Sequence, residues 1–411
     1  MKLLPAFFMT AALVPIVVAP HHDRGPAEVI VAWNQVLLDA LTTAQAAPPP
    51  AMRAGAIVAV SVFDAVDGVT AEYRPYAVTG RPPRDTSAPA AAAAAAHRSL
   101  SVLFPAQRAT FDARLAATLA GLPERDRATG AVDRGVAWGV TVADTVLALR
   151  ADDGFTAVPP TYSAGSEPGR WQPTPPAFPA APAFRQFATM RPWTLRSPAQ
   201  FRPPAPPALT GARYARDLAE VRALGGQAST GRSAFDTQTA QFWQSAPPIV
   251  LWDPVADTLI TGHHLGLTAA ARLLAHVNLA MADTVIAVWN AKNVYDTWRP
   301  VTAIQRTDPA WQPLLATPAF QEYPAGHPAV SQSAAAVLAQ RFGDRTRYTL
   351  TSPGMPGVTR TLPSFSAGVA QTSDARVFGG IHFRFACDAA TGMGRAVAAH
   401  VTATTLRRSS G

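Results

Sequence analysis

The chain has 411 residues, of which 48% are hydrophobic and 15% charged, and its formal net charge is +8. This composition provides for a large buried core and argues against global disorder. The cations are almost all arginine, with lysine only at Lys2 and Lys292, and no arginine cluster is interleaved with aromatic residues. We therefore expect no nucleic-acid partner, although a basic protein attracts small anions.

The N-terminus has the pattern of a secretory signal. Residues 1–22 contain one lysine, a long apolar run and then polar sequence. The small residues Val17–Ala19 predict cleavage, but Pro20 follows them, so an uncleaved anchor is the alternative. No later stretch is apolar for about 18 residues without charges, so we expect an exported protein, periplasmic or extracellular, with no integral membrane body. The single cysteine, Cys387, allows no internal disulfide.

Residues 27–154 are predicted to form an N-terminal helical half. Positions 54–66 are apolar nearly all round, as in a buried helix, and positions 136–154 are amphipathic and end at Gly154, a helix-stop residue. Asp64 lies in the first of these regions, and Asp67 directly follows it. We interpret them as capping or helix-surface residues rather than as metal ligands.

Residues 155–208 are too rich in proline for a helix or a central strand, yet they include Trp171 and Trp193. A flexible linker would not carry so many aromatic residues, so we expect an ordered, irregular belt over a helical core. Helical patterning returns over 209–408, and no strand series of period two is visible. The predicted fold class is all-α, a helical bundle whose two halves are joined by the belt.

Segment 266–300 predicts a long buried helix that ends in two cations. Lys292 and Arg299 are seven residues apart, about two helical turns, so both can point toward one pocket. Pro300 disfavours helical geometry at Arg299 and is expected to end the helix there. A chain that uses arginine elsewhere has kept lysine at 292, and a compact ammonium suits a tight oxyanion site.

Segment 320–342 joins a turn to an apolar helix. Gly326 permits an unusual backbone conformation, so its amide and that of His327 can face outward at the helix start, where free N–H groups and the helix dipole bind anions. His327 would then lie beside the bound group as a proton donor or acceptor. In a third segment, 373–401, Arg376 and His382 flank two glycines that can turn both side chains inward.

Together the three segments resemble the superfamily of vanadium-dependent haloperoxidases and type 2 phosphatidic acid phosphatases. The similarity is greatest to the soluble bacterial haloperoxidase-like branch, through WNAKNVYDTWRPVTAI, EYPAGH and GGIHFRF. It covers residues 290–398 and extends weakly into the N-terminal half. The family is all-α and built around a four-helix bundle, so the resemblance implies that fold here.

The resemblance implies an oxyanion site. Lys292, Arg299 and Arg376 would neutralise the equatorial oxygens of vanadate or phosphate, and Gly326 would donate its amide. Three fixed cations and helix-end amides suit both vanadate and the transition state of phosphoryl transfer.

The resemblance also assigns three further positions. His327 would be the acid–base residue. His382 would be the axial vanadium ligand of a peroxidase, or the phosphorylated nucleophile of a phosphatase. Phe320, seven residues before His327, matches a halide-pocket position.

Two departures from the family pattern bear on activity. Ala325 stands where the family usually has a serine hydroxyl, so one hydrogen bond to the oxyanion is missing. Ala386 stands where an aspartate, four residues after the axial histidine, often fixes the ring, and Asp388 lies two residues further on. Loss of one such donor costs a catalytic site about 3 kcal/mol.

Three functions are compatible with these residues. The first is a haloperoxidase-like enzyme with vanadate as cofactor and hydrogen peroxide and a halide as substrates. The second is a soluble exported acid phosphatase that needs no cofactor and hydrolyses a phosphate ester through a phosphohistidine. The third is an anion-binding homologue with weak catalysis. The sequence indicates neither the halide, nor the organic substrate, nor the oligomeric state.

Overall fold

The structure is a computed structural model that describes residues 27–409; the predicted signal lies outside them. This part of the chain forms fourteen α-helices, two short 3-10 helices and one β-hairpin, which confirms the all-α class. The α-helices are α1 (Glu28–Thr43), α2 (Pro48–Thr70), α3 (Ala88–Leu103), α4 (Arg108–Ala120), α5 (Glu124–Ala128), α6 (Ala131–Leu149), α7 (Ala212–Leu224), α8 (Ala234–Gln244), α9 (Pro248–Gly262), α10 (Leu267–Tyr295), α11 (Pro300–Gln305), α12 (Gly326–Phe342), α13 (Phe365–Phe378) and α14 (Arg384–Thr404). The 3-10 helices are η1 (Pro105–Gln107) and η2 (Arg185–Ala188), and the strands are β1 (Tyr348–Thr351) and β2 (Thr359–Leu362).

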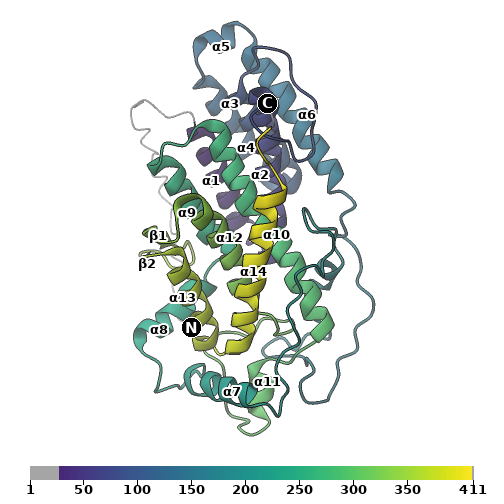
Figure 1. The fold of residues 1–411 in the computed structure, drawn as a ribbon, viewed down its shortest axis with the longest axis vertical. Coiled ribbons are helices and arrows are strands. Elements are labelled where there is room, and N and C mark those ends of the chain that lie inside the picture. Colours follow the sequence, from purple (N-terminus) through teal and green to yellow (C-terminus); the bar gives the residue numbers. More distant parts are fainter. Residues whose placement is uncertain (1–26, 410–411) are drawn as a thin grey trace, which may run out of the picture.

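The helices are arranged along one long axis. Figure 1 shows α3, α5 and α6 toward one end and α7 and α11 toward the other, with α10 and α14 between them. Helix α10 packs against α2 at the first end and against α12 and α14 further along. The helical halves therefore share one central helix. The boundaries proposed from sequence for separate domains stay a prediction.

Small residues bring α3 and α6 together. The alanines at 90–96 of α3 are buried, and a Cβ at Gly139 of α6 would collide with the carbonyl oxygen of Ala91. Close approach of two helix backbones therefore depends on glycine and alanine at this contact. The predicted buried helix at 54–66 is confirmed within α2.

Two polar contacts fix the ends of helices in this half. Asp64 and Asp67 cap backbone: Asp64 accepts from the amides of 76–78, and Asp67 accepts from those of Glu72 and Tyr73, so the capping interpretation is confirmed. The predicted end of α6 at Gly154 is wrong. The helix ends at Leu149, because the Arg150 side chain turns back to Asp153 and to the carbonyl oxygens of 191 and 192.

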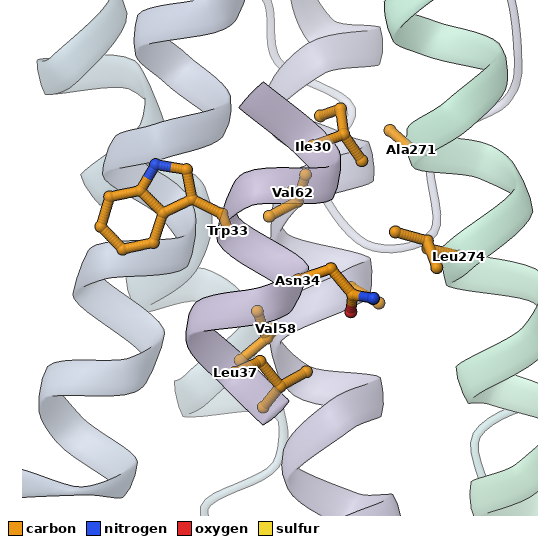
Figure 2. Close-up of a pocket in the computed structure, with 9 residues that line it drawn as sticks. Ile30, Trp33, Asn34, Leu37, Val58, Val62, Ala271 and Leu274 are labelled. Carbon is orange, nitrogen blue, oxygen red and sulfur yellow. The ribbon is translucent and has the colours of Figure 1, made fainter. Parts of the chain in front are cut away.

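A small cavity of about 20 Å³ lies between α1, α2 and α10 (Figure 2). Its walls are apolar except for Asn34, whose side chain donates to Asp257 (2.9 Å). A space of this size holds about one water molecule. It is a packing defect of the core and is too small for a substrate.

The proline-rich belt, 155–208, has no regular structure apart from η2, yet Trp171, Phe187 and Trp193 within it are buried. One carboxylate ties it to the core. Asp283 of α10, fully buried, accepts hydrogen bonds from the amides of Trp193, Thr194 and Leu195 and from the Thr194 hydroxyl, at 2.6–3.3 Å. The belt therefore covers the middle of α10 in a fixed register.

Replacement of Asp283 by alanine should lower the free energy of unfolding by about 3 kcal/mol or more, because it leaves two buried and two part-buried donors without an acceptor. Urea denaturation measures this change. The control is Asp152→Ala, an exposed site that should shift stability by no more than about 0.5 kcal/mol. An Asp283→Ala protein as stable as the control would contradict the role of this clamp.

Helix α10 ends at Tyr295 rather than at the predicted Arg299. Asp296 adopts a left-handed conformation (φ 47°), and its carboxylate is held by the Tyr162 hydroxyl (2.9 Å) and by Arg170 (2.8 Å). Arg299 is extended, and Pro300 begins α11 instead of only ending α10. Lys292 and Arg299 therefore reach one place through a turn and not along one helix face.

Two further features concern the C-terminal half. The antiparallel hairpin of β1 and β2 was not predicted, because strands of four residues are too short to show a period of two. Helix α10 is the one helix of residues 27–409 that is long and apolar enough to cross a membrane, with a mean hydropathy of 1.3 over its most apolar window. Because 94% of that window is buried inside the protein, α10 is a core helix here.

Candidate active site

The cations predicted to meet do so in a water-poor interior. Lys292 comes from the last turns of α10, Arg299 from the extended residue before α11, and Arg376 from the last turn of α13. All three side chains are at most 1% exposed. Burial lowers the pKa of both His327 and His382, and the charges of Lys292, Arg299 and Arg376 each lower it further, so the five groups form one electrostatic cluster.

Lys292 donates from Nζ to two consecutive carbonyl oxygens, Gln321 (2.6 Å) and Glu322 (2.9 Å). An ammonium has three donors, so one remains for another acceptor. Burial holds the pKa of Lys292 well below its usual range, Arg299 lowers it further, and Glu322 opposes them. A compact ammonium can donate to two adjacent carbonyl oxygens and still keep one N–H for a bound anion, which gives a second reason for the lone lysine.

Arg299 uses two of its three nitrogens on the protein. Nε donates to Phe320 O (2.7 Å), and Nη1 donates to Ile381 O (2.8 Å) and to Nε2 of His382 (3.1 Å). Arg376 uses only Nη2, which donates to Gln244 Oε1 (2.7 Å). Burial lowers the pKa of Arg299 to about 9 and that of Arg376 to about 10, so both guanidinium groups stay charged at neutral pH.

In the cation cluster, three buried guanidinium nitrogens have no partner among the described residues: Arg299 Nη2, Arg376 Nε and Arg376 Nη1. Buried donors are nearly always paired in folded proteins, so charged orphans at one place indicate a missing acceptor. The amides of Gly326 and His327, at the start of α12, also have no acceptor in the part of the chain that is described. These donors fit an oxyanion such as vanadate or phosphate.

Hydrogen bonds define the tautomer of His382. Arginine only donates, so Nε2 of His382 must accept from Arg299 Nη1 and carries the lone pair. The proton therefore lies on Nδ1, which donates to Oε1 of Glu322 (2.9 Å). Burial, with the nearby cations, holds the pKa of His382 well below its usual range, so the ring is neutral. Its unprotonated nitrogen faces the cations.

Glu322 is a residue that the sequence analysis did not single out. It is fully buried, and burial raises its pKa to about 7 although Lys292 and Arg299 oppose this. The signal available in the sequence was its position as the one acidic residue in the otherwise uncharged stretch 309–326. Asp388, the nearest carboxylate after His382 in the sequence, is instead exposed and paired with Arg213.

His327 has a different environment from His382. Its side chain is partly exposed and makes no hydrogen bond to any residue of 27–409. Loss of bulk water lowers the pKa of His327, and Arg376, Lys292 and Arg299 lower it further. A neutral imidazole beside orphaned cationic donors is able to accept a proton.

An aromatic wall borders the cations. The Phe320 ring lies 4.9 Å from the Arg299 guanidinium carbon, 5.2 Å from Lys292 Nζ and 5.1 Å from the ring of Trp289. Trp289 also lies near Gly326, since a Cβ there would be 3.9 Å from its ring. The structure thus places all seven residues predicted from the sequence near one another, and their roles stay a prediction.

Known proteins are similar to this chain in sequence and fold. Residues 272–411 match the family model of the VCPO second helical-bundle domain. A structure described as the first bacterial vanadium-dependent iodoperoxidase is 25% identical, with a TM-score of 0.84 over 95% of this chain and 99% of that one. Two structures of bacterial vanadium-dependent chloroperoxidase share the fold, each with a TM-score of 0.69. The holo form is 20% identical and covers 85% of this chain and 90% of its own. The apo form is 19% identical and covers 87% of this chain and 93% of its own. No curated protein sequence gives a significant match.

Fold, family model and site agree. Residues 272–411 match the VCPO second helical-bundle domain, and the chain as a whole has the fold of the bacterial vanadium-dependent haloperoxidases.

Proposed function

We propose that this protein is a vanadate-dependent haloperoxidase that oxidises a halide with hydrogen peroxide. The observation that carries the proposal is the set of buried, unpartnered guanidinium nitrogens of Arg299 and Arg376, together with the unprotonated Nε2 of His382 beside Arg299. A phosphate ester would suit the same cations. The iodoperoxidase and chloroperoxidase neighbours favour the peroxidase.

In this proposal the protein holds vanadate through its own charges. Lys292, Arg299 and Arg376 would neutralise its oxygens, the Gly326 amide would donate to it, and Nε2 of His382 would bind the vanadium. When bound, vanadate supplies Lewis-acid activation of peroxide without changing its own oxidation state. Arg299 Nη1 would give up its bond to His382 Nε2 when that nitrogen binds vanadate. The carbonyl oxygens of Phe320 and Ile381 still hold this guanidinium in place before the reaction begins.

His327 moves the protons. Its neutral imidazole accepts a proton from incoming hydrogen peroxide and returns it to the departing oxygen. Phe320 and Trp289 form the apolar wall against which a large, weakly hydrated halide would lie. The three cations stay in place throughout.

The test is an assay of purified protein with and without vanadate. Oxidation of iodide or bromide by hydrogen peroxide, followed with a phenol-red-type dye, should require vanadate and be inhibited by phosphate. Release of phosphate from an aryl phosphate, inhibited by vanadate, would instead support the phosphatase. If neither reaction occurs although vanadate binds, the protein is an anion-binding homologue.

Ala325 offers a further prediction. It is the N-cap of α12, fully buried, and its amide donates to Ala386 O (3.1 Å). Ala325→Ser should tighten vanadate binding about 10-fold, because a hydroxyl bonded to a charged group contributes about 1.5 kcal/mol. Calorimetric titration measures the affinity. The control is Ala339→Ser, further along the same helix; equal effects in both variants would contradict the assignment of residue 325 to the anion site.

A further inference from the structure

We propose that Glu322 is the positioning residue of His382 and replaces the carboxylate that the family pattern puts at residue 386. Its Oε1 accepts from His382 Nδ1 (2.9 Å) and from the next amide, that of Phe383 (2.9 Å). Two donors on consecutive residues fix the carboxylate and the ring together. The inference rests on the proposed function, since it concerns the ligand of the proposed cofactor.

The position 386 has no carboxylate to offer. Ala386 is fully buried, and its carbonyl oxygen accepts from the amide of Ala325 (3.1 Å). Ala325 and Ala386, the two positions that depart from the family pattern, are therefore in contact with each other. Glu322 is the only carboxylate that contacts His382 within residues 27–409.

Glu322 also connects the two sides of the site. Its backbone carbonyl accepts from Lys292 Nζ, while its side chain holds His382. Arg299 Nη1 donates to the opposite nitrogen of the same ring, His382 Nε2. The imidazole is thus held between a carboxylate on Nδ1 and a guanidinium beside Nε2. A carboxylate on the distal nitrogen makes the ligating nitrogen more basic and fixes its direction.

The consequence differs between two anions of similar shape. Vanadate needs a bond from Nε2 of His382, whereas inorganic phosphate is held by charge and N–H donors alone. Removal of the Glu322 charge should weaken the binding of vanadate and leave the binding of phosphate unchanged. A general loss of structure would weaken both equally.

The experiment compares Glu322→Gln with the wild type by calorimetric titration with orthovanadate and with inorganic phosphate. Vanadate affinity should fall about 10- to 100-fold, the range for lost ligand-orienting partners. Phosphate affinity should not fall. The matched control is Glu124→Gln, an exposed residue of α5, which should change neither affinity.

Each other outcome is decisive. Equal losses for both anions, or no loss for vanadate, would overturn the inference. A wild type that binds phosphate and not vanadate would overturn the proposed function instead. The wild-type protein gives an independent readout: ¹⁵N shifts of labelled histidine should show His382 protonated on Nδ1 and bare on Nε2, and the opposite tautomer would refute the role of Glu322 even if the variant failed to fold.

Discussion

His382→Ala should reduce vanadate affinity and haloperoxidase turnover by at least about 100-fold, because the nitrogen expected to bond vanadium is removed. Loss of partners that only orient such a ligand already costs about 10- to 100-fold, so loss of the ligand itself should cost more. The cations remain, so phosphate binding should survive. Calorimetric titration with both anions measures the difference.

The histidine control for this variant is His263→Ala. His263 is exposed at the end of α9, so its removal should leave both affinities unchanged. Vanadate that binds His382→Ala as tightly as the wild type would refute His382 as the ligand. An equal loss of affinity for vanadate and for phosphate would mean that the substitution disrupts the whole anion site rather than one bond to vanadium.

Lys292→Met should weaken both vanadate and phosphate by about 100-fold. A fixed charge or donor in a water-excluded anion site is worth about 3 kcal/mol, and methionine keeps the length of the side chain without its charge. The variant also leaves the carbonyl oxygens of Gln321 and Glu322 without their donor, which costs about 1–3 kcal/mol of stability each. Relief of repulsion from Arg299 and Arg376 offsets part of that cost.

Thermal unfolding at rising phosphate concentration separates the two effects of Lys292→Met. Ligand stabilisation depends on affinity, so the variant should gain far less from phosphate than the wild type. Arg345→Met removes a surface cation and is matched in net charge. If phosphate raises the melting temperature of both variants equally, Lys292 only supports the backbone of the loop at 321–322 and does not bind the anion.

The site could be predicted from the sequence where chemistry is tied to spacing. Three motifs each limit where a side chain can point: lysine before Arg-Pro, Gly-His before a helix, and arginine before Gly-Gly and histidine. Glu322 was missed because its role depends on His382, sixty residues away in the chain. A single acidic residue carries no local signal for such a contact.

The fold shows the same division. Apolar periodicity identified the buried α2 and α10. The end of α10 was misplaced because Asp296 takes a left-handed conformation held by Tyr162 and Arg170 of the belt. No rule of local propensity anticipates bonds made by a segment more than a hundred residues earlier. The hairpin of β1 and β2 was missed for a different reason, the shortness of its strands.

A crystal structure of the protein grown with vanadate would test most directly whether Lys292, Arg299, Arg376 and His382 form one oxyanion site. We predict vanadium bonded to Nε2 of His382, with its oxygens within hydrogen-bond distance of the side-chain nitrogens Arg299 Nη2 and Arg376 Nη1 that have no protein partner. Density for vanadate at any other place, with those guanidinium groups still lacking an acceptor, would contradict this account.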